Sequence, residues 1–437
     1  MTSTNIPVQR TAADKSQIRK IIASSLVGTV LEYYEFFVYG TVAALVLGGL
    51  FFPGEDPLVG TLAAFATFAV GFVARPFGSV LFGHFGDKLG RKATLVTSLL
   101  LMGGSTVAIG LLPTYEAIGV AAPILLVTMR LIQGLALGGE WGGAALMLVE
   151  NAKPGKRGLM GSIVMIGVPG GLVLASLVTS LAIWVSGDQF AVWGWRLPFL
   201  VSALLLAVAL FIRLSVSETP EFLEAKAKQD AAPKAPVGLV VRHHWKDLFL
   251  AFGVAAPGNA IFFIIATFTV NYATAGLGLD KGAVLIVQGI AGLIYCGTIP
   301  LVGLLADRIG LWQTELIGAI CAGVFIPLYF LMINTKSLGL MLVAMTLGMA
   351  GVHALLQAPQ AALFSSRFPV PVRYTGIAMS QALPTTVVGG TVALVATWFV
   401  SLTGDASLII YYVIGLSVLA AACALGFARR ANTEPSA

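Results

Sequence analysis

Charged residues are scarce in this chain of 437 residues. Asp, Glu, Lys and Arg together make up 11% of the sequence, whereas hydrophobic residues make up 57% and the mean hydropathy is +0.91. A soluble domain usually carries about 25% charged residues, so this chain has too few to cover a water-exposed surface. The composition excludes an ordinary soluble protein and predicts one that crosses a membrane many times.

Cysteine and histidine are also rare. Cys296, Cys321 and Cys423 lie in apolar runs without CxxC spacing, which favours small core residues over metal ligands or disulfide partners. The four histidines suggest no metal cluster, and the sequence contains no GxxxxGK[ST] phosphate loop. These absences argue against a metalloenzyme and an ATP-driven pump, so we expect no enzymatic activity, no metal and no cofactor.

Long apolar runs recur along the chain. A membrane-spanning helix needs roughly 20 apolar residues. Reading the runs against their polar breaks predicts twelve helices, near residues 21–50, 58–83, 93–113, 121–148, 159–186, 195–214, 248–274, 281–305, 314–333, 337–364, 374–402 and 406–428. The predicted fold class is therefore an all-α membrane protein.

The polar stretches divide these helices into two groups of six. We predict an N-terminal tail over 1–20, a six-helix bundle over 21–214, a linker over 215–247, a second six-helix bundle over 248–428 and a C-terminal tail over 429–437. The composition of the linker, EAKAKQDAAPKAP in part, suits a solvated segment with at most one surface helix.

Basic residues are distributed unevenly between the predicted loops. If the N-terminus is cytoplasmic, 21 of the 26 Lys and Arg residues fall on the cytoplasmic side. Only Arg196, Lys281 and Lys336 fall on the opposite side, and Arg75 and Arg130 lie inside predicted spans. The positive-inside rule therefore predicts that both termini are cytoplasmic.

A short charged loop, GHFGDKLGRK at 83–92, connects the second and third predicted helices. Its glycines suit a tight turn. A weaker copy, GLLADRIGLW, lies at 303–312 in the second half of the chain. The spacing of the two copies indicates two related halves, each built around the same turn.

Several motifs resemble the major facilitator superfamily. GHFGDKLGRK matches its loop between helices 2 and 3, and RLIQG at 130–134 resembles its helix-4 motif. RLIQGLALGGEWGGAALM at 130–147 and WGWRLPFL at 193–200 resemble the metabolite:H+ symporter family within it. Further likeness to the shikimate-transporting members of that family lies in GTLAAFATFAVGF (60–72) and APILLV (122–127).

The resemblance implies the major facilitator fold, in which two pseudo-symmetric bundles rock around a central site. It also implies a multi-pass protein of the bacterial cytoplasmic membrane that is driven by the proton gradient. Contacts of the charged loops would close the cytoplasmic side. The expected gate residues are Gly83, Asp87, Gly90, Arg91, Lys92 and Glu140, with Asp307 and Arg308 in the second copy. The alternative is that the bases of these loops only keep them inside.

Ionisable side chains within the first bundle are the candidates for proton coupling. An ionisable group near mid-bilayer costs at least about 2.5 kcal/mol. Glu32 and Glu35 lie on one face of the first helix, and a carboxyl there can bind and release a proton as water access alternates. Arg130 can neutralise such a carboxylate or bind a substrate carboxylate. A permanent structural pair is the alternative for all three. Arg75 is expected to snorkel or to join the inner charge cluster.

Neutral polar side chains dominate the predicted spans of the second bundle, apart from Glu315 near a helix end. A neutral hydrogen-bonding half facing a charged half suits a small hydroxylated or acidic solute. The candidate substrate-binding residues from both halves are Arg130, Gln133, Tyr34, Asn259, Gln288, His353 and Gln357. For His353 and the tyrosines, plain structural packing is the alternative.

The predicted function is a monomeric, proton-coupled symporter that imports a small organic acid by alternating access. Shikimate or a related hydroxylated or aromatic carboxylate is the leading substrate. Dicarboxylates or citrate, and proline or betaine, are the alternatives within the resembled family. A transporter-like receptor that moves no solute is a further alternative, although it would not need the carboxylates of the first helix. Neither nucleic acid nor a protein partner is expected.

Overall fold

The structure is a computed structural model. It describes residues 15–54, 56–89, 91–136, 146, 148–150, 152–153, 155–215, 236–369 and 372–431, without the side chains of 15–25, 79–80, 82–95, 212–215, 236 and 430–431.

The first half of the described chain is entirely helical apart from short connections. Apolar runs without helix-breaking clusters account for the long elements. In chain order the elements are α1 (Lys15–Val42), η1 (Ala43–Leu47), α2 (Gly48–Phe51), α3 (Pro57–Leu89), α4 (Arg91–Leu111), α5 (Tyr115–Ile118), α6 (Ala121–Ala136), α8 (Arg157–Met165), α9 (Gly167–Ser186), η2 (Gly187–Gln189), η3 (Gly194–Arg196) and α10 (Leu197–Ser215).

The second half repeats this pattern with more interruptions, and α12 lies inside the segment predicted as a linker. Its elements are α12 (Pro236–His243), α13 (Trp245–Phe263), η5 (Ile264–Phe268), α14 (Thr269–Asn271), η6 (Tyr272–Gly276), α15 (Lys281–Ile309), α16 (Leu311–Asn334), α17 (Leu338–Thr346), η7 (Leu347–His353), α18 (Ala354–Gln357), α19 (Gln360–Ser365), α20 (Arg373–Pro384), η9 (Thr385–Gly389), α21 (Gly390–Thr403) and α22 (Ser407–Ala431).

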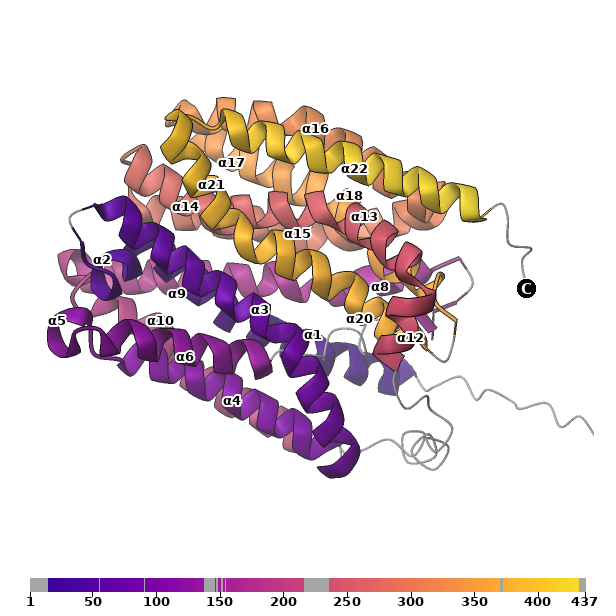
Figure 1. The fold of residues 1–437 in the computed structure, drawn as a ribbon, viewed down its shortest axis with the longest axis horizontal. Coiled ribbons are helices and arrows are strands. Elements are labelled where there is room, and N and C mark those ends of the chain that lie inside the picture. Colours follow the sequence, from indigo (N-terminus) through magenta and orange to yellow (C-terminus); the bar gives the residue numbers. More distant parts are fainter. Residues whose placement is uncertain are drawn as a thin grey trace, which may run out of the picture.

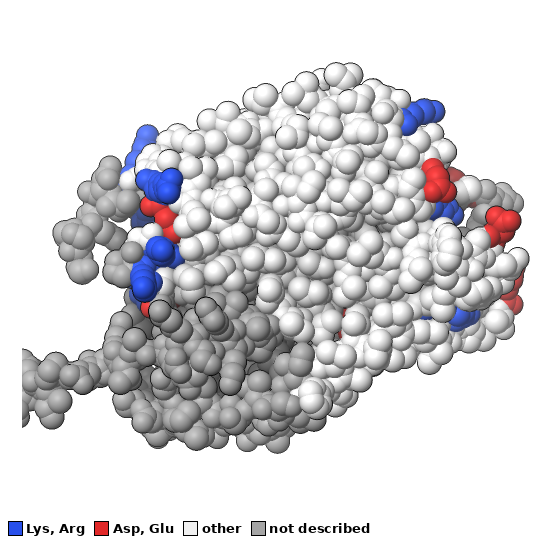
Figure 2. All heavy atoms as spheres, turned by 180° about the vertical axis from the view of Figure 1, so that it is seen from behind, with Lys and Arg blue, Asp and Glu red and all other residues white. Residues whose placement is uncertain are grey.

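Among the described residues, ten helical segments are long and apolar enough to cross a membrane. Two shorter apolar helices, Val96–Leu111 and Ala121–Ala136, occupy the positions of the third and fourth predicted spans. In the face drawn in Figure 2, the described charged side chains gather at the two ends of the molecule, and the wide band between them is nearly free of charge. This pattern suits a protein whose middle faces lipid.

The charged loops are tighter than the sequence predicted. Helix α3 continues to Leu89 and α4 begins at Arg91, so Gly83 lies inside a helix rather than in a turn. In the second copy, α15 ends at Ile309 and α16 begins after Gly310, whose φ of 109° is accessible mainly to glycine. In the described backbone, each copy thus reverses the chain within a residue or two.

Several helix pairs join the halves. Helices α8 and α9 of the first half pack against α15 of the second, and α3 packs against α21. Figure 1 shows the first-half helices, in indigo and magenta, on one side of this interface and the orange and yellow helices on the other. A site shared by the halves must lie between these pairs.

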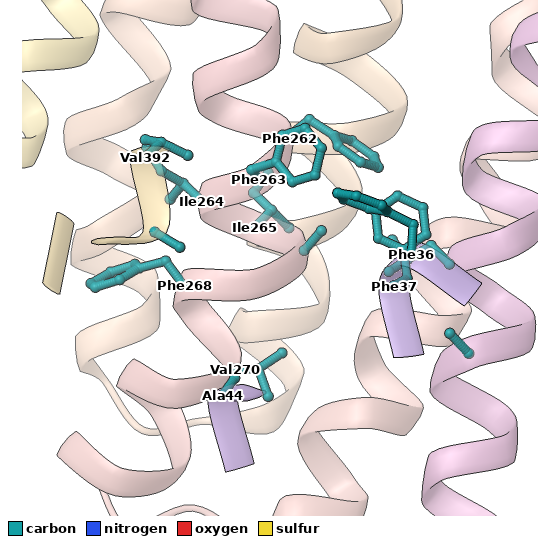
Figure 3. Packing of buried hydrophobic residues seen from close by; sticks show 14 of the residues in the cluster. Phe36, Phe37, Ala44, Phe262, Phe263, Ile264, Ile265, Phe268, Val270 and Val392 are labelled. Atoms are coloured by element: carbon teal, nitrogen blue, oxygen red, sulfur yellow. The ribbon is translucent and has the colours of Figure 1, made fainter. Parts of the chain in front are cut away.

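Aromatic rings fill the middle of the interface. Phe36 and Phe37 of α1 face Phe262 and Phe263 of α13 (Figure 3), with 5.6 Å between the ring centroids of Phe37 and Phe262. The Phe72 ring of α3 packs edge-on against Phe263 at 5.3 Å. Such pairs add about 0.5–1.5 kcal/mol each beyond the area that they bury. The halves therefore meet closely at mid-height in this conformation.

Candidate functional site

Glu35 is a buried carboxyl on α1, with 3% of its surface exposed. Thr106 of α4 donates a hydrogen bond to Glu35 Oε2 over 3.0 Å. Thr106 is itself fully buried. The packing of α1 against α4 and α10 therefore places this carboxyl in the interior of the first bundle.

Arg130 is fully buried on α6. Its guanidinium donates to Gln133 Oε1 over 2.8 Å and to the carbonyl of Phe68 over 3.1 Å. The guanidinium carbon lies 4.0 Å from the ring centroid of Tyr39, close enough for a cation–π interaction. A Cβ at Gly71 would come within 2.6 Å of a guanidinium nitrogen, so the glycine makes room for this cation.

A chain of hydrogen bonds links these two buried groups. Gln133 Nε2 donates to Thr106 Oγ1 over 2.6 Å, and Gln133 Oε1 accepts from Arg130. The order is thus Glu35, Thr106, Gln133, Arg130. Within the described residues no ion pair joins Arg130 to Glu35 directly, and Thr106 and Gln133 connect the two groups.

Glu32 has a different partner from Glu35. Its carboxylate lies 3.7 Å from a guanidinium nitrogen of Arg75 on α3, and both side chains are largely buried. The Arg75 guanidinium also lies 5.8 Å from the Phe72 ring. The described partner of Arg75 is thus a carboxylate of α1, whereas the charged side chains of the inner loop lie outside the described residues.

Tyr34 lies apart from this chain, although it was predicted to bind substrate. Its hydroxyl donates to the carbonyl of Pro198 over 2.7 Å, and the side chain is fully buried. Tyr34 therefore anchors α1 to α10 in this conformation.

The predicted polar residues of the second half are buried and neutral. Gln288 on α15 donates to the carbonyls of Ile265 and Ala266 and accepts from Ser176 of α9 over 3.1 Å. The π-helical geometry of η5 turns those two carbonyls away from the helix ladder. The Gln288 side chain thus provides hydrogen bonds to two carbonyls at the bend and connects the two halves.

Three further polar residues of the second half, His353, Gln357 and Asn259, are also buried and have partners within the protein. His353 Nδ1 lies 2.7 Å from the Tyr295 hydroxyl, and its ring packs on Phe262. Gln357 Nε2 donates to the sulfur of Met165, which belongs to the first half. Asn259 donates to the carbonyl of Ala255 one turn earlier on α13. Of these three residues, Gln357 contacts the first half directly, whereas the contacts of His353 and Asn259 lie within the second half.

One end of the bundle carries contacts between the halves, and we call it the Asp307 end. Asp307 accepts hydrogen bonds from the backbone N–H groups of Gly158 and Leu159, over 2.7 and 2.9 Å, at the start of α8. Arg373 pairs with Glu150 over 3.1 Å. Arg308 is exposed. The start of a helix favours an anion, so these hydrogen bonds form a latch between the halves at Asp307, one of the residues expected at the gate.

The other expected gate residues cannot be placed in such contacts. The side chains of Gly83, Asp87, Arg91 and Lys92, and the whole of Gly90 and Glu140, lie outside the described residues.

The opposite end has a small cavity of about 260 Å³ between the halves. Asn271 closes its floor by donating to the carbonyl of Ala44 over 2.8 Å. Lys281 is its charged lining residue, and Thr61 and Thr274 add hydroxyls. Among the described residues, hydrogen bonds therefore connect the halves at both ends of the molecule.

Sequence reasoning missed Thr106, Arg75 and Lys281 as site residues. Thr106 lies in an apolar run, where a single hydroxyl gives no signal. Arg75 could have been paired with Glu32, because both are charges expected inside the membrane and such charges rarely stay unpaired. Lys281 was noticed only as a rare base on its side of the membrane.

Known proteins match most of this chain. Residues 25–393 match the family described as Major Facilitator Superfamily. A metabolite transport protein of the Escherichia coli K12 inner membrane, YhjE, is 42% identical over 395 residues, 87% of each chain. The shikimate transporter of the same strain is 38% identical over 384 residues, again 87% of each.

Two other likenesses cover more of the chain. A glycine betaine, proline, ectoine and pipecolic acid transporter of Dickeya dadantii strain 3937, OusA, is 33% identical over 433 residues, 97% of this chain and 85% of the relative. The solved structure of a D-xylose–proton symporter superposes with a TM-score of 0.70 at 18% identity, over 94% of this chain and 97% of that one. This structural likeness concerns the fold alone.

These matches agree with the all-helical architecture, the apolar middle band and the closed interface between two halves. The relatives are transporters rather than enzymes, and this is a multi-pass protein of the bacterial inner membrane. The chain belongs to the major facilitator superfamily, and it is a metabolite transporter of that family.

Proposed function

We propose that this transporter is a proton-coupled symporter that imports a small organic acid. Twelve spans form two six-helix bundles with both termini in the cytoplasm, and a single chain carries out the cycle by rocking of the bundles. The single observation that supports proton coupling most strongly is the buried hydrogen-bond chain from Glu35 to Arg130. A buried carboxyl that is connected to a fixed cation is a natural place for a proton to bind and leave.

The coupling follows from the charge balance along this chain. Arg130 keeps its proton, so it attracts either an ionised Glu35 or a substrate carboxylate. When an acid binds near Arg130, the second anion becomes unfavourable, and Glu35 takes up a proton. When Glu35 loses the proton toward the cytoplasm, the acid is released. Only the loaded or the empty carrier closes easily, because only then is the buried charge balanced.

Shikimate or a related hydroxylated carboxylate is the proposed substrate. Arg130 can hold a carboxylate through two parallel hydrogen bonds, and the neutral groups at Gln288, His353 and Gln357 suit hydroxyls. The cation Lys281 in the cavity at the opposite end also favours an anion. The 38% identity to a shikimate transporter supports the same class.

A zwitterion such as proline or betaine is the second candidate. The likeness to a proline and betaine transporter covers 97% of this chain. Dicarboxylates and citrate remain alternative acids. Of the described cations inside the bundle, Arg75 is paired with Glu32. Arg130 is then the cation that can hold a substrate carboxylate, and this favours a substrate with a single carboxylate.

Uptake into proteoliposomes tests the proposal. Purified protein is reconstituted, and uptake of labelled shikimate, citrate, succinate, proline and betaine is measured with and without an inward proton gradient. We expect shikimate to accumulate only when the gradient is imposed. Accumulation that does not depend on the gradient would contradict proton coupling, and a preference for proline or betaine would contradict the acid.

A further inference from the structure

The Thr106 hydroxyl has more partners than one proton can serve. Its oxygen lies 3.0 Å from Glu35 Oε2 and 2.9 Å from the carbonyl oxygen of Met102, one turn earlier on α4. It also accepts the hydrogen bond from Gln133 Nε2. A hydroxyl has one proton to donate and two lone pairs that accept, so Thr106 can donate to Glu35 or to Met102 but not to both.

The protonation state of Glu35 decides between the two arrangements. An ionised Glu35 only accepts, so the Thr106 proton turns toward it. A protonated Glu35 can donate its own O–H to Thr106 Oγ1, and the Thr106 proton then turns to the carbonyl of Met102. In both arrangements the Thr106 oxygen also accepts from Gln133, and every group has a partner.

We infer that Thr106 is the positioning residue that lets Glu35 gain and lose a proton without leaving an unpaired buried group. This inference rests on the proposed proton coupling at Glu35. A buried donor or acceptor left without a partner is costly, and Thr106 is fully buried. A rotation of one hydroxyl removes that cost in both states, with no movement of the helices.

The same geometry isolates Arg130 from the proton. Gln133 donates to Thr106 in either arrangement, so its Oε1 stays in place for Arg130. The guanidinium therefore keeps its orientation whether or not Glu35 is protonated. Substrate and proton then interact through charge alone, while the hydrogen-bond frame around Arg130 remains constant.

Other charged and titratable groups near Glu35 come from each packed helix. Glu32 and Tyr34 lie on α1, Arg75 on α3, Arg130 on α6 and Arg196 at the start of α10. Glu32 is balanced by Arg75, and Tyr34 and Arg196 bond to backbone carbonyls. Among the described side chains, the hydrogen bond to the Glu35 carboxyl comes from Thr106, so a change at Thr106 acts on Glu35 directly.

Two variants separate the hydroxyl from the shape of the side chain. Thr106→Val keeps the branched shape and removes the hydroxyl, whereas Thr106→Ser keeps the hydroxyl. The first measurement is the pH dependence of uptake of labelled shikimate, or of whichever panel solute accumulates. We expect the pH of half-maximal uptake to rise by about one unit in the Val variant, because the lost bond to the ionised carboxylate is stronger than the lost bond to the carboxylic acid. It should stay unchanged in the Ser variant.

The second measurement is the infrared band of the protonated Glu35 carboxyl. The band is identified as the C=O absorption that Glu35→Gln removes. In Thr106→Val it should move to higher frequency, because the carboxyl O–H has lost its acceptor, and in Thr106→Ser it should not move. This readout needs only folded protein in detergent or lipid and does not depend on transport.

The outcomes distinguish this inference from the proposed function. Equal losses of uptake in both variants, with the pH profile and the infrared band unchanged, would overturn the role of Thr106 and leave proton coupling intact. If Glu35→Gln still accumulates solute in response to the gradient, the proposed coupling at Glu35 fails, and the inference fails with it. A shift of the profile and the band in Thr106→Val alone supports the switch.

Discussion

The interiors of the two halves differ in kind. The first half buries Glu32, Glu35, Arg75 and Arg130, and each of them lies in an ion pair or a hydrogen-bond chain. The second half presents neutral groups at the interface, such as Gln288 and its bond to Ser176. The second half does bury one carboxyl, Glu315, but on α16, a helix that packs against α22 of its own half.

This difference suggests a division of roles. The connected charges of Glu32, Glu35, Arg75 and Arg130 lie in the first half, where fixed partners can compensate a change of charge. Neutral hydrogen-bonding groups lie in the other half and connect across the interface, where they can exchange a partner in the first half for a solute at low cost. A rocking transporter needs both kinds of group, and placing them in separate bundles lets each be tuned alone.

Replacing the two buried carboxyls in parallel gives the sharpest test of this division. An inward gradient of two pH units corresponds to about a 100-fold accumulation per proton. Glu35→Gln should lose all of it while still exchanging labelled for unlabelled solute, and Glu315→Gln should keep it. The measurement is the accumulation ratio in proteoliposomes. Equal losses in the two variants would mean that the position of the carboxyl does not matter.

Arg130 should give the next largest effect. Arg130→Ala removes the end of the hydrogen-bond chain and the cation proposed to hold the substrate carboxylate, and losing such a charged contact costs about 2 kcal/mol or more in binding. We expect the KM for the acid to rise about 30-fold or more, measured by initial rates of uptake. Arg130→Lys should recover only part, because an ammonium lacks the planar fork. Unchanged uptake at normal protein abundance would refute a role in binding.

A substitution at Asp307 tests whether this charge of the second half holds the two halves together at the end of the bundle. Hydrogen bonds to a charged group contribute about 1.5–3 kcal/mol, so Asp307→Ala should raise the population open at this end about tenfold or more. Arg373→Gln removes an exposed ion pair worth about 1 kcal/mol at most and serves as the matched control. The rate at which maleimide labels a Ser162→Cys reporter measures the opening. Equal rates in both variants would contradict the latch.

The smallest effect is expected at the opposite end. Lys281→Gln removes the charge from the cavity, and we expect the KM for an external acid to rise about twofold at low salt and not at high salt, because exposed charges are screened. Lys336→Gln, a base in the neighbouring loop 335–337, is the control and should change nothing. If both variants raised the KM by a similar factor, the effect would come from the positive charge of the whole surface and not from the cavity.

Much of the fold follows from the sequence. Apolar runs predicted the positions of the helices, because a span must satisfy its backbone internally and is therefore helical. The resemblance drew attention to Asp307, but its partner, the start of α8, is known only from the structure. The burial of Glu35 and Arg130 could also be predicted. An ionisable side chain in a membrane span is costly when it faces lipid, so it is expected to face the interior of the bundle.

The partners of these residues did not follow from the sequence. Whether Arg75 meets Glu32 depends on the rotation of α3 about its axis, which apolar periodicity hardly constrains in a helix that is hydrophobic all round. Gln133 and Thr106 lie between Glu35 and Arg130 only because α4 passes between α1 and α6. The role of Gln288 depends on the π-helical bend at η5, and no local pattern in the sequence indicated that bend.

The latch at Asp307 has a consequence for how this protein varies. Its acceptor is a side chain, but its donors are the backbone N–H groups of Gly158 and Leu159. A change of the Leu159 side chain leaves its N–H in place, whereas a Cβ at Gly158 would come within 2.9 Å of an Asp307 carboxylate oxygen. The contact therefore depends on Asp307 and on the absence of a side chain at Gly158. Short hydrogen bonds to main-chain amides are also weakened little by dissolved ions. A rise in salt concentration at this end of the molecule would therefore weaken the exposed ion pair of Arg373 and Glu150 more than this contact.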